Sequence, residues 1–190
     1  MLRKIYKTRR LIIRPLLMND YRTWSNSCKI GFPKMSKWDI DPRKPKMNSF
    51  RKTIKRHLLK ARKDQTYIWA IFEKKSGFII GLLDIHIIER DILQKANLGY
   101  RIFNNYWRQG FAHEAIKKLV KKCLIDLKLN RLEAVIDLDN IASICLMKRL
   151  NYRCEGVRKN YWYQEGRWDD QMVYIIDRKE LKLPRLKIYK

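Results

Sequence analysis

The most regular pattern of apolar positions lies in the middle of the chain. Apolar residues there repeat at i, i+1, i+4 and i+5, which is typical of the buried face of one α-helix. The positions concerned are Phe111, Ala112, Ala115, Ile116, Leu119, Val120, Cys123, Leu124 and Leu127. Before this helix, Ala96–Phe103 is an apolar, β-compatible run that Asn104 and Asn105 end. The pattern predicts a strand, a short turn that contains Gly110, and then a helix N-terminus.

This turn suits a phosphate or pyrophosphate group. The N-terminus of a helix leaves several backbone N–H groups unpaired at the positive end of the helix dipole. Gly110 would let the backbone come close to such an anion, and Arg108 and His113 could add charge or hydrogen-bond donors. Because most strand–glycine–helix turns are only connections, the pattern leaves both interpretations open.

The remaining patterns predict elements on both sides of this centre. The strands are expected at 11–15, 67–72, 78–88, 131–136, 152–158 and 168–176, and further helices near 20–24, 50–63 and 139–150. Residues 29–48 contain prolines, Gly31 and scattered charges, which predicts an irregular loop. This order of elements predicts an α+β fold with a mostly antiparallel sheet.

The helix expected at 50–63 is strongly basic. Asn48 or Ser49 is placed to cap its N-terminus. The positions expected to face inward are Phe50, Ile54, Leu58 and Leu59. Its Lys/Arg face is either solvated or a nucleic-acid contact, and the sequence leaves both open.

A carboxylate and an imidazole share one face of the strand expected at 78–88. Asp84 and His86 are two residues apart, and side chains of a strand alternate between its faces. Such a pair could serve as a general base and its partner. The two could equally be polar residues on a solvated face.

Composition bounds the fold and the class of protein. A chain of 190 residues that is 46% hydrophobic can bury one good core, so a single domain is expected. There is no run of about 18 apolar residues, no signal-peptide pattern and no CxxC pair, which favours a reduced, cytoplasmic protein without a membrane span. Cys123 and Cys145 are expected on buried helix faces.

The charge is unusual. A formal net charge of +25 attracts polyanions such as RNA, acidic surfaces or a phosphorylated cofactor, and disfavours a polycationic small substrate. A lysine-rich compositional bias explains the same charge, because the basic residues are spread along the whole chain.

Five motifs follow one another along the chain: Arg9-Arg10-Leu11-Ile12-Ile13-Arg14-Pro15-Leu16, Leu98-Gly99-Tyr100, Trp107-x-x-Gly110-x-Ala112-x-Glu114-Ala115, Asn140-x-x-Ser143 and Arg149-Leu150-Asn151-Tyr152-x-x-Glu155-Gly156. In this order they resemble the motifs of GNAT N-acetyltransferases of the RimJ/RimL type, over about nine-tenths of the chain. The resemblance implies a mixed, mostly antiparallel twisted sheet of about seven strands flanked by about four helices. It also implies one domain over residues 1–180, followed by a basic tail over 181–190.

The resemblance implies acetyl-CoA as the acetyl donor and no metal. The backbone of Tyr100, Arg101 and Ile102 would bind the pantetheine arm, which Asn140 would also hydrogen-bond. Ser143 would place a hydroxyl near the thioester sulfur. The turn residues that would bind the CoA pyrophosphate are Arg108, Gln109, Gly110, Phe111, Ala112 and His113.

Two departures from the family pattern concern catalysis. Many members carry a general-acid tyrosine seven residues after the asparagine, where this chain has Met147, so the acid role falls to Ser143 or to no residue. RimL-like members carry a glutamate where this chain has Trp162, so the usual base is missing. The substitutes for that base are Asp84, His86, Glu165 and Asp169, and Glu155 fits a structural role as well as a chemical one.

Three functions are consistent with these residues. The first is acetylation of a protein N-terminal α-amine, such as that of a ribosomal protein, with the basic surface contacting a ribosome or RNA. The second is acetylation of a small-molecule amine or antibiotic, which an acidic acceptor pocket formed by residues 20–48 and 158–170 would favour. The third is a non-enzymatic, RNA-binding protein of the same fold. A monomer or a homodimer is expected in each case.

Overall fold

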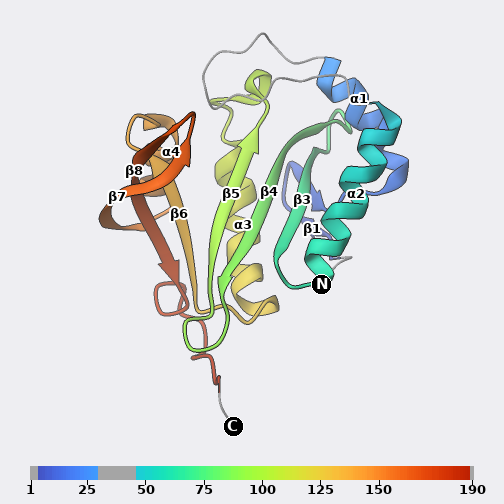
Figure 1. The fold of residues 1–190 in the computed structure, drawn as a ribbon. Helices are drawn as coiled ribbons and strands as arrows, with labels where there is room; N and C mark the ends of the chain where they lie inside the picture. Colours follow the sequence, from blue (N-terminus) through green and yellow to red (C-terminus); the bar gives the residue numbers. More distant parts are fainter. Residues whose placement is uncertain (1–3, 30–45, 189–190) are drawn as a thin grey trace. The chain divides into compact units, whose positions relative to one another are not determined.

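The computed structural model describes residues 4–29 and 46–188 (Figure 1). The elements are, in chain order, β1 (Tyr6–Lys7), β2 (Leu11–Arg14), η1 (Met18–Asp20), α1 (Tyr21–Lys29), α2 (Met47–Arg62), β3 (Thr66–Glu73), β4 (Ile79–Glu89), β5 (Lys95–Ile102), η2 (Asn104–Tyr106), α3 (Phe111–Asp126), β6 (Arg131–Asp137), α4 (Ile141–Arg149), β7 (Arg153–Gln164) and β8 (Arg167–Asp177). Most of the loop expected at 29–48, and with it that part of the expected acceptor pocket, lies outside the described residues. Within the described ranges, no helix is long and apolar enough to cross a membrane.

The strands form a mixed sheet in the order β1-β2-β3-β4-β5-β6-β8-β7. The pairs β1–β2, β2–β3, β3–β4, β6–β8 and β7–β8 are antiparallel. In contrast, β5 and β6 pair in parallel, with Lys95–Asn97 opposite Arg131–Glu133. The predicted α+β class with a mostly antiparallel sheet is therefore confirmed, and the short strand β1 adds one strand to those read from the sequence.

The chain divides into two compact units. The first unit is Met1–His86 with Gly99–Leu119, and the second unit is Ile87–Leu98 with Val120–Lys190. The predicted apolar face of α3 is buried at every position except Ala112, which is half-buried. Cys123 is buried as expected, whereas Cys145 on α4 is exposed, which corrects the expectation for that thiol.

In the first unit, α2 packs on the sheet through a narrow apolar stripe. Its Phe50 and Ile54 are buried in one cluster with residues of β3 and β4. Leu58 and Leu59 are exposed, contrary to expectation. Leu59 lies opposite Phe50 around the helix axis, whereas Leu58, four residues after Ile54, lies at the edge of the buried stripe. The helix begins earlier than predicted, and its N-cap, Lys46, makes no side-chain capping bond, so the predicted cap by Asn48 or Ser49 is wrong.

In the second unit, the hairpin of β7 and β8 pairs with β6 through β8 (Figure 1). β7 continues to Gln164, six residues beyond the predicted end at Arg158. Its register shifts between Cys154 and Gly156 and again between Arg158 and Trp162. Bulges of this kind break the period-two pattern, which is why the sequence underestimates the length of the strand.

Candidate active site

The predicted anion-binding residues lie together in the turn before α3. Arg108 has a φ of 58° and Gly110 a φ of 77°, so the chain passes twice through the left-handed region before the helix begins at Phe111. The first ladder bond of the helix runs from the Glu114 N–H to the Gly110 carbonyl oxygen at 3.1 Å. The amides of residues 111–113 precede that bond and point out of the helix N-terminus. The sequence prediction of a glycine turn at a helix N-terminus is therefore confirmed.

Arg10 braces this turn from the start of β2. Its backbone N–H donates to Glu114 Oε1 at 2.9 Å, and its Nε donates to Glu114 Oε2 at 2.7 Å. Its Nη1 donates to the Gln109 carbonyl oxygen at 2.9 Å, and the guanidinium lies over the Phe111 ring, 4.3 Å from the ring centroid. One arginine thus fixes the turn before α3 and the first turn of that helix. Arg10 and Glu114 belong to separate sequence motifs, and their hydrogen bonds become visible only in the folded chain.

Glu114 is held in its ionised form. Desolvation raises the pKa of its carboxyl, but hydrogen bonds from Thr8 and from the Arg10 backbone and side chain, with the Arg10 charge, outweigh it and lower the pKa. A lowered pKa in the folded state means that the ion pair stabilises the protein above pH 4.5, the ordinary value for glutamate. That stabilisation is lost as the pH falls below 4.5 and through the folded-state pKa.

We expect Arg10→Ala to lower the free energy of unfolding by about 1–2 kcal/mol at neutral pH, because it leaves the half-buried Glu114 carboxylate without its charged donor. Denaturant unfolding measures the loss, with the exposed neighbour Arg9→Ala as control. The difference between wild type and variant should shrink as the pH is lowered below 4.5, where Glu114 becomes protonated. An undiminished difference at low pH would contradict the ion pair as its source.

The end of β5 is positioned by close backbone packing. A side chain at Gly81 on β4 would run into the Arg101 carbonyl oxygen and the Ile102 backbone, so the two strands approach closely there only because residue 81 has no Cβ. Trp107 Nε1 donates to the Ile102 carbonyl oxygen at 2.7 Å, which ties the turn before α3 to the same strand end. The predicted pantetheine-binding segment, Tyr100 to Ile102, and that turn therefore belong to one braced assembly in the first unit.

Asp84 and His86 form the predicted pair on β4. His86 Nε2 lies 2.8 Å from Asp84 Oδ2, and His86 Nδ1 lies 3.1 Å from the hydroxyl oxygen of Thr66, which is buried. A Cβ added at Gly99 would come closer to the Asp84 carboxylate than real Cβ atoms come to other atoms, so Gly99 makes the room for that carboxylate. The sequence pattern gives no sign of the roles of Thr66 and Gly99. The β3–β4 register places Thr66 opposite His86, and the close approach of β5 places Gly99 against Asp84.

A second histidine, His57 on α2, interacts electrostatically with Asp84. Burial, followed by the charges of Arg56 and Lys60, lowers the pKa of His57 on α2, while the charge of Asp84 opposes that change. His57 is therefore favoured as a neutral side chain, and it does not neutralise Asp84 as a fixed cation would.

The second unit carries Asn140 and Ser143. Asn140 is the N-cap of α4, and its Oδ1 accepts a hydrogen bond from the Ser143 N–H at 3.2 Å, which leaves the amide NH₂ group as a donor. Ser143 lies in the first turn of α4 and is partly exposed. Met147, at the position of the family's tyrosine, is fully buried.

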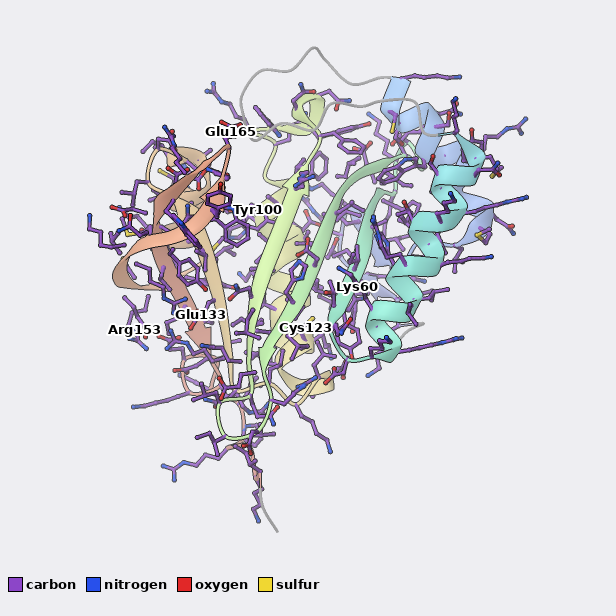
Figure 2. The ribbon with its side chains drawn as sticks, in the orientation of Figure 1. Lys60, Tyr100, Cys123, Glu133, Arg153 and Glu165 are labelled. Atoms are coloured by element: carbon purple, nitrogen blue, oxygen red, sulfur yellow. The ribbon has the colours of Figure 1, made fainter. Side chains whose placement is uncertain are left out.

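Buried charge in the second unit serves structure. Glu133 on β6 is 2% exposed, and its two oxygens pair with Arg131 Nε and Arg158 Nη2, each at 2.9 Å. Arg131 also pairs with Glu155, which in turn pairs with Arg153 on β7, and Figure 2 labels Glu133 and Arg153 in this part of the sheet. Both the side-chain hydrogen bond from Arg131 and its charge lower the pKa of Glu155 and outweigh desolvation, which favours the structural role for this residue.

The other two base candidates lie on the β7–β8 hairpin. Both carboxylate oxygens of Asp169 have partners: Arg167 Nε lies 2.9 Å from Oδ1, and Gln164 Nε2 donates to Oδ2 at 2.9 Å. Glu165 is exposed in the hairpin turn with a φ of 49° (labelled in Figure 2). Among the described residues, no group of three or more His, Cys, Asp or Glu side chains is arranged to hold a metal ion.

Comparison with known proteins connects this geometry to a family. Two curated relatives are an N-acetyltransferase named YoaA from Bacillus subtilis, 36% identical over 108 residues, and one named p20 from Bacillus licheniformis, 31% identical over 112 residues. These alignments cover 57% and 59% of this chain, and the chain spans 60% and 62% of the relatives' lengths.

Solved structures share the fold. The ribosomal-protein-S5-alanine acetyltransferase from Vibrio fischeri has a TM-score of 0.73 at 18% identity, covering 92% of this chain and 96% of its own. RimJ from Mycobacterium smegmatis, solved with a CoA disulfide, has a TM-score of 0.74 at 23% identity, covering 93% and 85%.

The model of the acetyltransferase (GNAT) domain family matches residues 10–153. This segment begins at the arginine that braces the turn before α3, and it includes that turn, the Asp84–His86 pair and the Asn140 cap. The chain therefore belongs to the GNAT acetyltransferase family.

Proposed function

We propose that this chain is an acetyl-CoA-dependent N-acetyltransferase whose acceptor is the N-terminal α-amine of a ribosomal protein. The observation that carries the proposal is the turn before α3, where Arg10 and Glu114 hold a positive-φ glycine at a helix N-terminus. The names of two proteins of the same fold support the choice of donor and acceptor: one is a ribosomal-protein-S5-alanine acetyltransferase, and the other was solved with a CoA disulfide.

The turn before α3 fits the pyrophosphate of CoA. Among the described residues other than its chain neighbours, only Arg10 Nη2 lies within 4 Å of the Cβ position at Gly110, at 3.5 Å, so the backbone there is open to an approaching anion. The amides of residues 111–113 would bind the pyrophosphate with help from Arg108 and Gln109. Residues 100–102 of the first unit would hold the pantetheine arm. On α4, the Asn140 amide nitrogen is proposed as a further donor to the cofactor. When bound, acetyl-CoA supplies an acyl thioester that an amine can attack.

Asp84 is proposed as the group that accepts the proton of the acceptor ammonium, because only a neutral amine is a nucleophile. His86 would orient the Asp84 carboxylate through its Nε2, with the Thr66 hydroxyl holding the other ring nitrogen. Asp84 is preferred over Asp169 because both oxygens of Asp169 are occupied. Ser143 is proposed to hold a proton at Oγ for the leaving thiolate.

The family match supports one acetyltransferase domain, because it runs through residues of both compact units. We therefore keep residues 1–180 as one proposed domain and residues 181–190 as a basic tail. We also propose that the protein is cytoplasmic and that it works as a monomer or a homodimer without a resident metal.

A thiol-release assay with acetyl-CoA tests the proposal. Acceptors are a peptide with a free N-terminal alanine or serine, the same peptide with a blocked N-terminus, and small amines. We expect CoA release only with the free peptide, and mass spectrometry should place one acetyl group on its α-amine. Turnover on small amines alone would contradict the peptide acceptor, and no turnover with any amine would contradict the enzyme.

A further inference from the structure

The basic residues of α2 form one exposed face, and we propose that this face docks on the phosphodiester backbone of RNA. The face is defined by Arg51, Lys52, Lys55, Arg56, Lys60 and Arg62 of α2 and by its C-cap, Lys63, all exposed. Seen down the helix axis, these residues cover the half opposite the buried Phe50 and Ile54. In Figure 2, long side chains with nitrogen tips extend from α2 away from the sheet.

The cationic face of α2 differs from other basic residues of the chain. In the second unit, Arg131, Arg153, Arg158, Lys159 and Arg167 each pair with a carboxylate. Arg178 instead donates to backbone carbonyl oxygens. On the described part of the chain, none of the seven cations of this face has a carboxylate partner, and residues 46–63 contain no Asp or Glu.

The same face destabilises its own helix. Arg51 and Lys55, Lys52 and Arg56, and Arg56 and Lys60 are like-charged pairs at i, i+4, which repel each other. The first turn carries no acidic residue, and the N-cap makes no side-chain bond, so the positive end of the dipole meets further positive charge. Local rules of this kind are broken where function requires it, and a bound polyanion would relieve the repulsion.

The residues of the cationic face favour binding to phosphate groups of RNA over insertion into the acyl region of a membrane. Phe50 and Ile54 of α2 are already buried in the first unit, and the exposed Leu59 is flanked at three and four residues on either side by Lys55, Arg56, Arg62 and Lys63. The helix therefore offers no continuous apolar face to insert among acyl chains. From Arg51 to Lys63 the cations extend over about 18 Å at 1.5 Å per residue, which is long enough for several phosphates of one chain. The three arginines offer forked donors that suit phosphate oxygens.

Contacts to phosphate alone carry no base sequence information. No aromatic side chain is exposed on α2 for base stacking, so we expect binding that is independent of base sequence. The choice of RNA over DNA rests on the proposed function, because a ribosomal-protein acceptor is presented among RNA.

The test is fluorescence anisotropy with a labelled RNA duplex of about 20 base pairs, titrated between about 50 and 300 mM salt. The variant is Arg51→Gln/Lys52→Gln/Lys55→Gln, which leaves Arg56 and Lys60 beside His57 in place. The matched control is Lys117→Gln/Lys118→Gln/Lys121→Gln, which removes the same charge from exposed positions of α3. We expect the α2 variant to weaken binding about tenfold or more and to lower the salt slope by about 2–3, with little change in the control.

Equal weakening by both variants would overturn the docking surface, because the effect would then come from net charge. Equal affinity for a DNA duplex of the same sequence would overturn the choice of RNA. Binding to phosphatidylserine vesicles without binding to RNA would replace the proposal with a membrane surface. Arg51, Lys52 and Lys55 are not among the charges that act on His57 beside Asp84, so unchanged peptide turnover in the α2 variant separates the failure of this inference from failure of the proposed enzyme.

Discussion

Gly110→Glu is expected to abolish acetyl-CoA binding. The substitution places a carboxylate at the N-terminus of α3, where the proposed pyrophosphate would lie, and adds repulsion to steric exclusion. We expect the dissociation constant to rise at least about 100-fold, because the anion loses its amides and meets a like charge. The backbone strain at a φ of 77° adds a stability cost of about 1–2 kcal/mol. Calorimetry with wild type and variant at two salt concentrations measures the loss.

The chain offers a matched control for this experiment. Gly166 in the β7–β8 turn has a φ of 84°, and no atom of the described residues outside its chain neighbours lies within 4 Å of a Cβ placed there. Gly166→Glu therefore adds the same charge and a similar backbone strain at a glycine outside the turn before α3. Retained binding in Gly166→Glu with loss in Gly110→Glu supports the site. Unchanged binding in Gly110→Glu, or no binding by wild type, would remove the proposed cofactor site.

Asp84→Asn is expected to lower kcat at least about 100-fold, because general base catalysis contributes roughly 10²–10⁴ in rate. The asparagine keeps the shape of the side chain beside Gly99 and His86 but cannot accept a proton at neutral pH. The KM for acetyl-CoA should stay unchanged, since Asp84 is on β4 and takes no part in the turn before α3. Steady-state kinetics with the free peptide measures both constants.

The rival carboxylate supplies the control. Asp169→Asn removes a side chain that is held by Arg167 and Gln164, so we expect kcat close to the wild-type value. Gly99→Ala should resemble Asp84→Asn, because the added methyl group displaces the carboxylate. A large loss in Asp169→Asn with little loss in Asp84→Asn would transfer the base role to the β7–β8 hairpin.

Local patterns identified most of the elements correctly. The buried face of α3 follows from helical periodicity, and the shared face of Asp84 and His86 follows from strand alternation. The misreadings fall where local rules meet other constraints: α2 begins without the expected cap, and β7 is lengthened through bulges.

The sequence by itself determined the family, the class of fold and the turn that carries Gly110, because these depend on residues close together in the chain. Only the tertiary structure joined Arg10 to Glu114 across 104 positions, Thr66 to His86, and Glu133 to Arg158. It also showed Gly99 as the space for the Asp84 carboxylate. Such pairs depend on strand order and register, which many distant contacts set together, so no local period in the sequence encodes them.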